Sequence, residues 1–433
     1  MRTSDGLWLP LTDPRVKVVL PAMGKFGTPL LAGSLRRRAI RSEALPPADE
    51  AMLKLGRGNS SCKECLPLQT TLGSMLHYLK KRPAGEVTAY FMATAHGPCR
   101  FGQYRFFAER TIANHRIPDA AVLTLTPDNG YGGLGNRVTL AGWRAIVIGD
   151  LLDEIWATIL AGAEDREEGL AILAREYQAI LGVIHRSWPL LAAQLKKTAV
   201  ELSRIRLHTP YGALPKISLL GEIYVRHDPI SLQNLIERLA DQGFVVRTAQ
   251  TSEWLKYTDW LVRNSIAGER TLPWWARYWV KIFFDRQIRR LLAPSNLFHY
   301  EEKVEVGPII EAGRRFISPH LSCEAILTVG AALHEILNPS CGVISIGPFG
   351  CMPSRLAESI LSEKFTSTEK KAALNGHGHS PCRLSLLDEE RRFPFLAIET
   401  DGNIFPQIIE ARLEAFCLQA RRLNGAMQRG EGE

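Results

Sequence analysis

Residues 86–112 read EVTAYFMATAHGPCRFGQYRFFAERTI, and this stretch decides the fold class. Residues 86–95 are rich in β-branched and aromatic side chains, which predicts a buried strand. The Gly-Pro turn follows, and residues 100–112 have the apolar spacing of a helix. A buried strand that leads through a short turn into a helix is the repeating unit of a parallel sheet covered by helices.

Similar units recur along the chain. Strands are predicted at residues 16–24 and 120–127, and helices from residue 28, over 136–163 and over 165–205. Residues 208–216 are rich in Pro and Gly and read as a linker. The pattern then restarts with strands at 216–226, 244–249, 341–348 and 393–401, a helix at 229–243, a polar loop at 364–383 and a final amphipathic helix at 408–423. We therefore predict an α/β protein with two doubly wound, mostly parallel-sheet halves, residues 1–210 and 211–433, together with extra helices and a ligand site in the crevice between them.

Composition excludes several classes of protein. No run of eighteen apolar residues is present, and the first residues lack a basic stretch followed by an apolar core, so we expect a cytoplasmic chain without a membrane span or a secretory signal. The net charge of +8 is scattered and mixed with carboxylates. No zinc-finger, helix-turn-helix or RNA-recognition signature accompanies it, which favours an anionic partner or cofactor over nucleic acid.

The eight cysteines carry the functional signal, because cytoplasmic thiols stay reduced and a disulfide framework is not expected. Cys65 directly precedes a predicted helix, Cys99 lies between a strand and a helix, and so does Cys351. In an open α/β sheet such junctions gather at the carboxyl edge, where ligands bind. Helix amino-termini also stabilise thiolates. The three thiols are therefore predicted to converge in the crevice between the halves.

Alternative interpretations of these residues remain open. Cys62 and Cys65 form a single C-x-x-C, whereas structural zinc sites pair two such motifs, and the only further candidates are His377, His379 and Cys382 in a polar segment. A thioredoxin-like dithiol would follow a strand directly, which residues 46–61 do not provide. The segment GYGGLG at 130–135 fits the spacing of a dinucleotide-binding turn, but no acidic residue follows at the end of a second strand. A thiolate-bound iron–sulfur cluster tolerates ligands that are far apart in sequence and uses all three junction cysteines.

Several segments, taken in order, resemble the iron–sulfur component of the 2-hydroxyacyl-CoA dehydratase and CoA-substrate-specific activase superfamily. The matching segments are KECLPLQTTLGSML (63–76), FMATAHGPCRFGQY (91–104), GEIYVRHDP (221–229), EAILTVG (324–330), ISIGPFGCMPSRLAESIL (344–361) and FLAIETDG (395–402), which ARLEAF (411–416) follows. The closest resemblance is to the cluster-bearing region that follows duplicated ATPase domains in many relatives. This chain has no phosphate loop and no actin-like ATPase motif, so ATP hydrolysis would belong to a separate chain.

The resemblance implies α/β subunits, in homo- or heterodimers, that hold an oxygen-sensitive cluster, commonly [4Fe–4S] or in one branch a double cubane. Carried onto this sequence, its ligands are Cys65, Cys99 and Cys351, with Cys62 as an additional candidate at a position that is not regularly Cys in the family. It also implies an actin-like ATPase activator that injects a low-potential electron. The substrate would be an acyl-CoA or another small reducible molecule.

Residues close to the expected ligands are candidates for the surroundings of the cluster. Arg100 and Arg355 each follow a ligand closely and would offset added negative charge, or would be ordinary helix-terminal cations. Glu222, Tyr224 and Arg226 end a predicted strand and would line the crevice, or would form a buried hydrogen-bonded ion pair. The function expected is that of a dehydratase-like or reductase component. The alternatives are a non-catalytic electron-transfer or scaffold subunit, and a zinc or dithiol protein.

Overall fold

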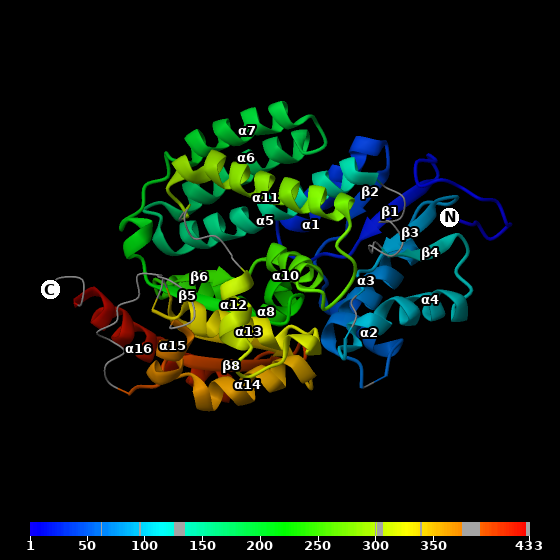
Figure 1. Cartoon of the computed structure of the whole chain (residues 1–433). Helices are drawn as coiled ribbons and strands as arrows, with labels where there is room; N and C mark the ends of the chain where they lie inside the picture. Colours follow the sequence, from blue (N-terminus) through cyan, green and yellow to red (C-terminus); the bar gives the residue numbers. More distant parts are fainter. Residues whose placement is uncertain are drawn as a thin grey trace.

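A computed structural model describes residues 1–61, 63–94, 97–124, 135–298, 300, 306–337, 340–374 and 390–429. It contains two four-stranded, all-parallel sheets covered by helices, which confirms the predicted α/β class (Figure 1). The strands of the first sheet are β1 (Val16–Leu20), β2 (Arg41–Ala44), β3 (Val87–Phe91) and β4 (Ala120–Leu123), and those of the second are β5 (Lys216–Gly221), β6 (Val245–Thr248), β7 (Ser340–Pro348) and β8 (Phe395–Thr400).

The helices fill the connections between these strands. Those that precede β5 are α1 (Gly27–Leu35), α2 (Glu50–Gly58), α3 (Leu66–Lys81), α4 (Tyr104–Asn114), α5 (Gly135–Gly162), α6 (Arg166–Val183) and α7 (Trp188–Leu202). Those that follow it are α8 (Pro229–Leu232), α9 (Leu235–Asp241), α10 (Thr251–Arg263), α11 (Leu272–Leu292), α12 (Val306–Gly313), α13 (Ala325–Glu335), α14 (Met352–Lys364), α15 (Ser367–Leu374) and α16 (Gln407–Arg429). In the described part of the chain no helix has the length and apolar character that a bilayer crossing requires.

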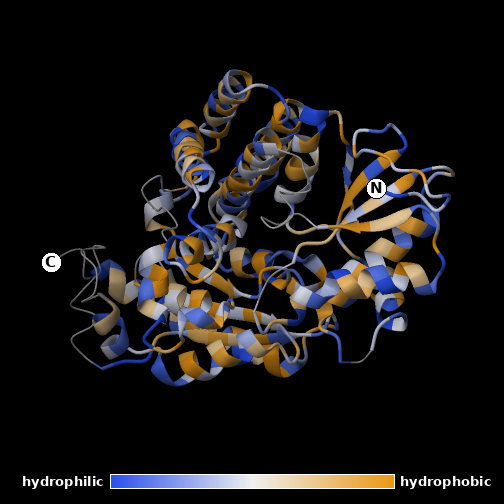
Figure 2. Ribbon diagram, turned by 45° about the vertical axis from the view of Figure 1, so that its right-hand side comes forward, coloured by the Kyte–Doolittle hydropathy of each residue, from blue (hydrophilic) through white to orange (hydrophobic). Residues whose placement is uncertain are grey.

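The first sheet buries both of its faces, because successive side chains of a strand point to opposite sides. Val19 of β1 packs with residues of α3 and α4 in one hydrophobic cluster, whereas its neighbours Val18 and Leu20 pack with α1 in another. Tyr90 and Ala89 of β3 divide in the same way between the two clusters. These strands are mainly hydrophobic in Figure 2. Near-continuous apolar strands are therefore the sequence signature of this sheet.

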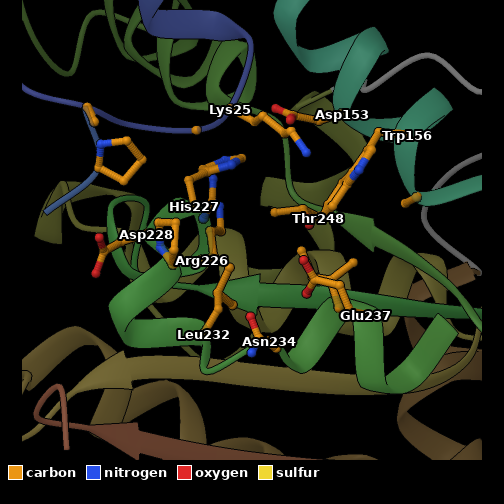
Figure 3. A pocket seen from close by; sticks show the side chains of 16 residues that line it. Lys25, Asp153, Trp156, Arg226, His227, Asp228, Leu232, Asn234, Glu237 and Thr248 are labelled. Carbon is orange, nitrogen blue, oxygen red and sulfur yellow. The ribbon is translucent and has the colours of Figure 1, made fainter. Parts of the chain in front are cut away.

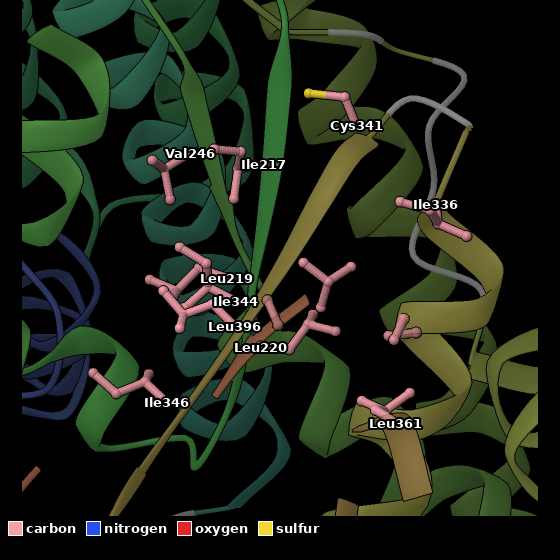
Figure 4. Packing of buried hydrophobic residues seen from close by; sticks show 14 of the residues in the cluster. Ile217, Leu219, Leu220, Val246, Ile336, Cys341, Ile344, Ile346, Leu361 and Leu396 are labelled. Atoms are coloured by element: carbon pink, nitrogen blue, oxygen red, sulfur yellow. The ribbon is translucent and has the colours of Figure 1, made fainter. Parts of the chain in front are cut away.

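The second sheet carries the largest hydrophobic core. Leu219 of β5 lies opposite Ile344 of β7, which in turn lies opposite Leu396 of β8, so the three side chains form a row across neighbouring strands (Figure 4). A separate helical core joins α5, α6 and α7 to α11, and Figure 1 shows these four helices stacked beside the two sheets. Because α11 follows the expected boundary at residue 210 in the sequence, this helical core is built from both halves of the chain.

The two halves repeat one topology. The strand orders are β2-β1-β3-β4 and β6-β5-β7-β8, so in each sheet the third strand along the chain lies beside the first. A tightly packed helix pair precedes that strand in both halves, α2 with α3 and α12 with α13. A Cβ added at Gly73 would lie 1.8 Å from the carbonyl oxygen of Met52, and one added at Gly330 would lie 1.9 Å from that of Ile309. In both pairs, a glycine therefore allows the backbones of the two helices to approach each other closely.

The structure differs from the sequence-based expectations in a few elements. The strand expected over 216–226 ends at Gly221, and the helix expected over 229–243 is divided into α8 and α9 at Gln233 and Asn234, whose φ angles of 49° and 57° are left-handed. Part of the polar segment 364–383 is a helix, α15, and the rest of that segment after residue 374 lies outside the described residues. The short edge strand β2 was not predicted, because only four residues form it and they include Arg and Glu.

Candidate metal centre

The three junction cysteines occupy the same structural position, the N-cap of a helix. Cys65 is the N-cap of α3, Cys99 that of a 3₁₀ turn (Arg100–Gln103) that leads into α4, and Cys351 that of α14. All three have extended backbones, with φ of −75°, −71° and −69° and ψ of 157°, 136° and 117°. An N-cap side chain lies beside backbone N–H groups that have no partner inside the helix. This position favours a negatively charged sulfur.

The three thiols surround one carboxylate. Each is half-buried, and burial raises the pKa of each, to about 11 for Cys99 and about 12 for Cys351. The negative charge of Glu222 raises the pKa of all three thiols further, and Cys99 interacts electrostatically with both Cys65 and Cys351. Three cysteines from residues 65 to 351 are thus close enough for their charges to act on one another.

Backbone amides oppose these effects at every sulfur. The N–H groups of Leu68, Phe101 and Ser354, in the first turn after each cysteine, lower the pKa of the adjacent thiol. They do not reach the geometry of a full capping hydrogen bond, so the sulfurs remain available for other partners. The helix N-termini therefore lower the pKa of the thiols, whereas burial and the neighbouring negative charges raise it. A bound cation would lower the pKa further and stabilise the thiolates.

Glu222 belongs to a buried acidic pair. Its Oε2 accepts hydrogen bonds from the N–H groups of Tyr224 and Val225, at 3.0 Å and 2.8 Å, which fixes the carboxylate at the turn after β5. Burial, and then the charge of Glu324, raise the pKa of Glu222 well above its usual range. Glu324 forms a 2.7 Å ion pair with Arg226, which is 3% exposed. The ion-pair interpretation of Arg226 is thereby confirmed, although its partner is Glu324 and not Glu222.

Tyr104 is a site residue that sequence reasoning missed. Its hydroxyl lies 2.5 Å from the sulfur of Cys65. Burial and the charges of Cys65 and Glu222 raise the pKa of Tyr104 well above its usual value, so the hydroxyl keeps its proton and can donate it to the sulfur. The available signal was the FGQY that ends one of the matching segments, five residues after Cys99.

Three residues proposed for the cluster surroundings have partners of their own. Tyr224 is buried and its hydroxyl interacts with Thr70 of α3. Arg355 forms ion pairs with Glu358 and Glu399 at 2.7 Å and 3.1 Å. Arg100 is exposed and donates a hydrogen bond to the carbonyl of Lys63. Of the sequence-predicted neighbours, Glu222 is therefore the one that interacts with all three thiols among the described residues.

The topological repeat explains why these segments meet. Cys99 and Cys351 follow equivalent strands, β3 and β7, and Glu324 is the N-cap of α13 just as Cys65 is the N-cap of the equivalent α3. The two repeats are in contact at the site, since a Cβ added at Gly97 would lie 2.8 Å from the carbonyl oxygen of Ser322. Gly97 also has a φ of 112°, a backbone conformation that favours glycine. The candidate site is therefore assembled from corresponding junctions of the two repeats.

The remaining cysteines that the structure describes are buried. Cys341 donates to the carbonyl of Lys216 at 3.1 Å, and Cys323 and Cys417 pack in the core of the second half. All six cysteines that the structure describes are free thiols. Cys62, His377, His379, Cys382 and the segment 130–134 lie outside the described residues. The proposed zinc ligands and the fourth thiol therefore stay predictions.

A single metal ion and an iron–sulfur cluster require different spacings of their ligands. Within the described ranges, no three His, Cys, Asp or Glu side chains are grouped closely enough to hold one metal ion. Ligands of one zinc ion lie at most about 4.6 Å apart, because each Zn–S bond is about 2.3 Å long. An iron–sulfur cubane separates its thiolates more widely, by roughly 6–7 Å. Ligation of a cluster by the three thiols therefore stays a prediction.

Comparisons with known proteins do not identify a family for this chain. No model of a known protein family matches the chain, and no curated protein matches it either.

Proposed function

We propose that this chain is an iron–sulfur protein that holds a [4Fe–4S] cluster on Cys65, Cys99 and Cys351. The observation that carries the proposal is the placement of these three thiols at helix N-termini, where each interacts electrostatically with Glu222 and Cys99 interacts with both of the others. When bound, such a cluster supplies one-electron transfer and, at an iron without a protein ligand, a Lewis acid.

The chain's own residues prepare the site for this chemistry. The helix N-termini direct N–H groups at the sulfurs, and the Tyr104 hydroxyl lies at that of Cys65. Such contacts tune both cluster stability and reduction potential. The half-buried position limits contact of the sulfurs with water while leaving an approach for an electron donor or a small substrate.

Electrons would come from a separate ATP-hydrolysing activator, since this sequence contains no phosphate loop. The reaction proposed is either reduction of a small molecule or dehydration of a 2-hydroxyacyl-CoA. In the dehydration the injected electron is returned at the end of the reaction, because loss of water is redox-neutral. The competing role is that of an electron relay without a substrate of its own. Titanium(III) citrate, as a chemical electron donor, separates these roles, because a relay consumes no substrate when an acyl-CoA is supplied.

Anaerobic purification tests the central claim. We expect about four iron and four sulfide per chain, and an EPR signal after reduction. Cys65→Ser, Cys99→Ser and Cys351→Ser should each lose most of this iron. Cys341→Ser and Cys417→Ser are matched controls that remove a buried thiol from another part of the core and should retain it. Cys62→Ser shows whether a fourth thiol takes part. A colourless wild-type protein without iron, or stoichiometric zinc that survives all three substitutions, would overturn the proposal.

A further inference from the structure

A second site lies in a cavity of about 250 Å³ that shares no lining residue with the three thiols. It is open at the carboxyl ends of strands from both sheets: Gly24 and Lys25 follow β1, His227 follows β5, and Thr248 ends β6. Ligands of open α/β sheets bind at these edges. Small-molecule sites usually measure about 300–1,000 Å³, so a cavity of this size takes a small ligand.

The cavity contains polar groups that lack partners. The Nε2 atom of His227 is fully buried and makes no hydrogen bond in the described part of the chain, and the ring interacts with the backbone of Ala249. The carboxylate of Asp153 forms no hydrogen bond or ion pair with any residue that the structure describes. Asp153 is half-buried and lines the cavity, so a positively charged group of a ligand can reach its carboxylate.

Lys25 supplies an opposite charge beside them. Its ammonium lies 4.6 Å from the centre of the Trp156 ring and has no carboxylate partner among the described residues. Lys25 and Asp153 interact electrostatically without forming an ion pair. Figure 3 shows Lys25, Asp153 and His227 gathered at one end of the cavity, with Asn234 and Glu237 at the other.

The remaining walls are largely apolar. Trp156 and Ala157 of α5, Leu232 of α8 and Ile236 of α9 line the cavity between the polar ends. Arg226 also lines it, but its guanidinium is occupied by Glu324 and by the carbonyls of Gly221 and Ala249. The exposed Lys25 is therefore available to an anionic group, and Asp153 is a carboxylate available to a cationic one, with Glu237 at the other end of the cavity.

We propose that this cavity binds a small apolar α-amino acid as its zwitterion. The ammonium group of the ligand pairs with Asp153, and its carboxylate pairs with Lys25. The apolar side chain packs against Trp156 and Leu232. A zwitterion satisfies both unpaired charges at once, whereas a simple amine or a simple acid satisfies only one.

The titration behaviour of the lining supports this ligand. Burial, and then the charge of Asp150, raise the pKa of Asp153 well above its usual range, and a ligand ammonium would offset both effects. Burial, and then the charge of Arg226, lower the pKa of His227 to about 3, so its ring stays neutral and adds no positive charge beside the ligand ammonium. Asp150 itself is satisfied by the N–H groups of Thr251 and Ser252, at 2.9 Å each.

Calorimetric titration of the full chain with three matched probes tests the proposal. Valine carries both charged groups, isobutylamine lacks the carboxylate, and isovalerate lacks the ammonium. We expect valine to bind one per chain with a Kd between about 10 μM and 1 mM, and both truncated probes to bind at least tenfold more weakly. Absence of saturable binding for alanine, valine and leucine, or equal affinity for valine and either truncated probe, would overturn the proposal.

Substitutions locate the binding in this cavity. Asp153→Asn and Lys25→Met should each weaken valine binding at least tenfold, while the surface variants Asp241→Asn and Lys364→Met should not change it. A triple variant, Cys65→Ser/Cys99→Ser/Cys351→Ser, should still bind valine, so this result does not depend on the cluster. Retained valine affinity in both Asp153→Asn and Lys25→Met would contradict the assignment. Two variants are used so that the test still gives a result if one of them fails to fold.

Discussion

The hydroxyl of Tyr104 lies 2.5 Å from the sulfur of Cys65, which joins the segment that carries Cys99 to another proposed ligand. Tyr104→Phe removes one hydrogen-bond donor without changing the packing of the ring. We expect iron content to be retained and the reduction potential to fall by tens of millivolts, because a donor to a ligand sulfur stabilises the reduced, more negative cluster. Redox titration followed by EPR measures this shift.

Tyr78→Phe provides the matched control for this prediction. The Tyr78 hydroxyl donates to Glu86 at 2.7 Å, away from the three thiols, so its removal should leave the potential unchanged. Equal potentials in wild type and Tyr104→Phe would show that the Tyr104 hydroxyl does not interact with a cluster ligand in the loaded protein.

The contact between α2 and α3 predicts a large difference between two similar substitutions. Gly73→Ala places a Cβ 1.8 Å from the Met52 carbonyl oxygen, so the helices must separate, at a cost of about 3 kcal/mol or more. Gly58→Ala, near the end of α2, meets no atom within 4 Å and should be neutral or stabilising by up to about 1 kcal/mol. Thermal unfolding of both variants measures the contrast, and similar midpoints would contradict the observed packing.

The buried ion pair between Arg226 and Glu324 predicts non-additive effects on stability. Arg226→Met leaves the Glu324 carboxylate buried without its cation, which should cost about 3–5 kcal/mol of unfolding free energy. Arg226→Met/Glu324→Gln removes the unpaired charge and should regain part of this loss. In the surface pair Arg204–Glu201, Arg204→Met should cost less than about 1 kcal/mol. Chemical denaturation tests the order, and a double variant less stable than Arg226→Met would contradict it.

Asp228 predicts a specific dependence of stability on pH. It is the N-cap of α8 and is buried, and burial raises its pKa to about 6. Between its unfolded pKa of about 3.9 and this value, the folded protein binds more protons than the unfolded chain, so rising pH destabilises the fold. Asp228→Asn keeps a good N-cap but cannot ionise.

The variant should therefore gain stability relative to wild type as the pH rises from 4 to 7, by up to about 3 kcal/mol. The neighbouring His227 has the opposite effect, because a neutral buried His destabilises the fold as the pH falls below about 6.5. Its contribution is present in both proteins and cancels in the difference. Unfolding curves at several pH values measure that difference, and a constant value would exclude titration of Asp228.

The sequence predicted the fold class well because both sheets are built from short apolar strands, such as β3 and β7, that lead directly into helices. Elements set by tertiary context were missed. The polar edge strand β2 is a strand because it pairs with β1. The break between α8 and α9 depends on two residues with left-handed backbones that are not glycine. The topological repeat was also missed, because it consists of the same strand order and the same helix pairing in both halves, while the amino-acid sequences of the two halves differ.

At the candidate site, the junction positions of Cys65, Cys99 and Cys351 were readable because each precedes a helix. Their partners were harder to find. Tyr104 contacts Cys65, which is 39 residues away in the sequence, and Glu324 at the start of α13 interacts with Glu222 after β5. The amino-acid cavity carried no sequence signal, since Lys25, Asp153 and His227 are unremarkable in isolation and converge only in the folded chain.

Division of the thiols between the two repeats also bears on biosynthesis. Cys65 and Cys99 leave the ribosome before Cys351, which lies about 250 residues further along the chain than Cys99. An N-terminal half that folds first would present two thiols and Tyr104 without the third ligand. Insertion of the proposed cluster would therefore wait until the segment that carries Cys351 has been made, and a truncated product that lacks β7 would expose Cys65 and Cys99 to oxidation without the third proposed ligand.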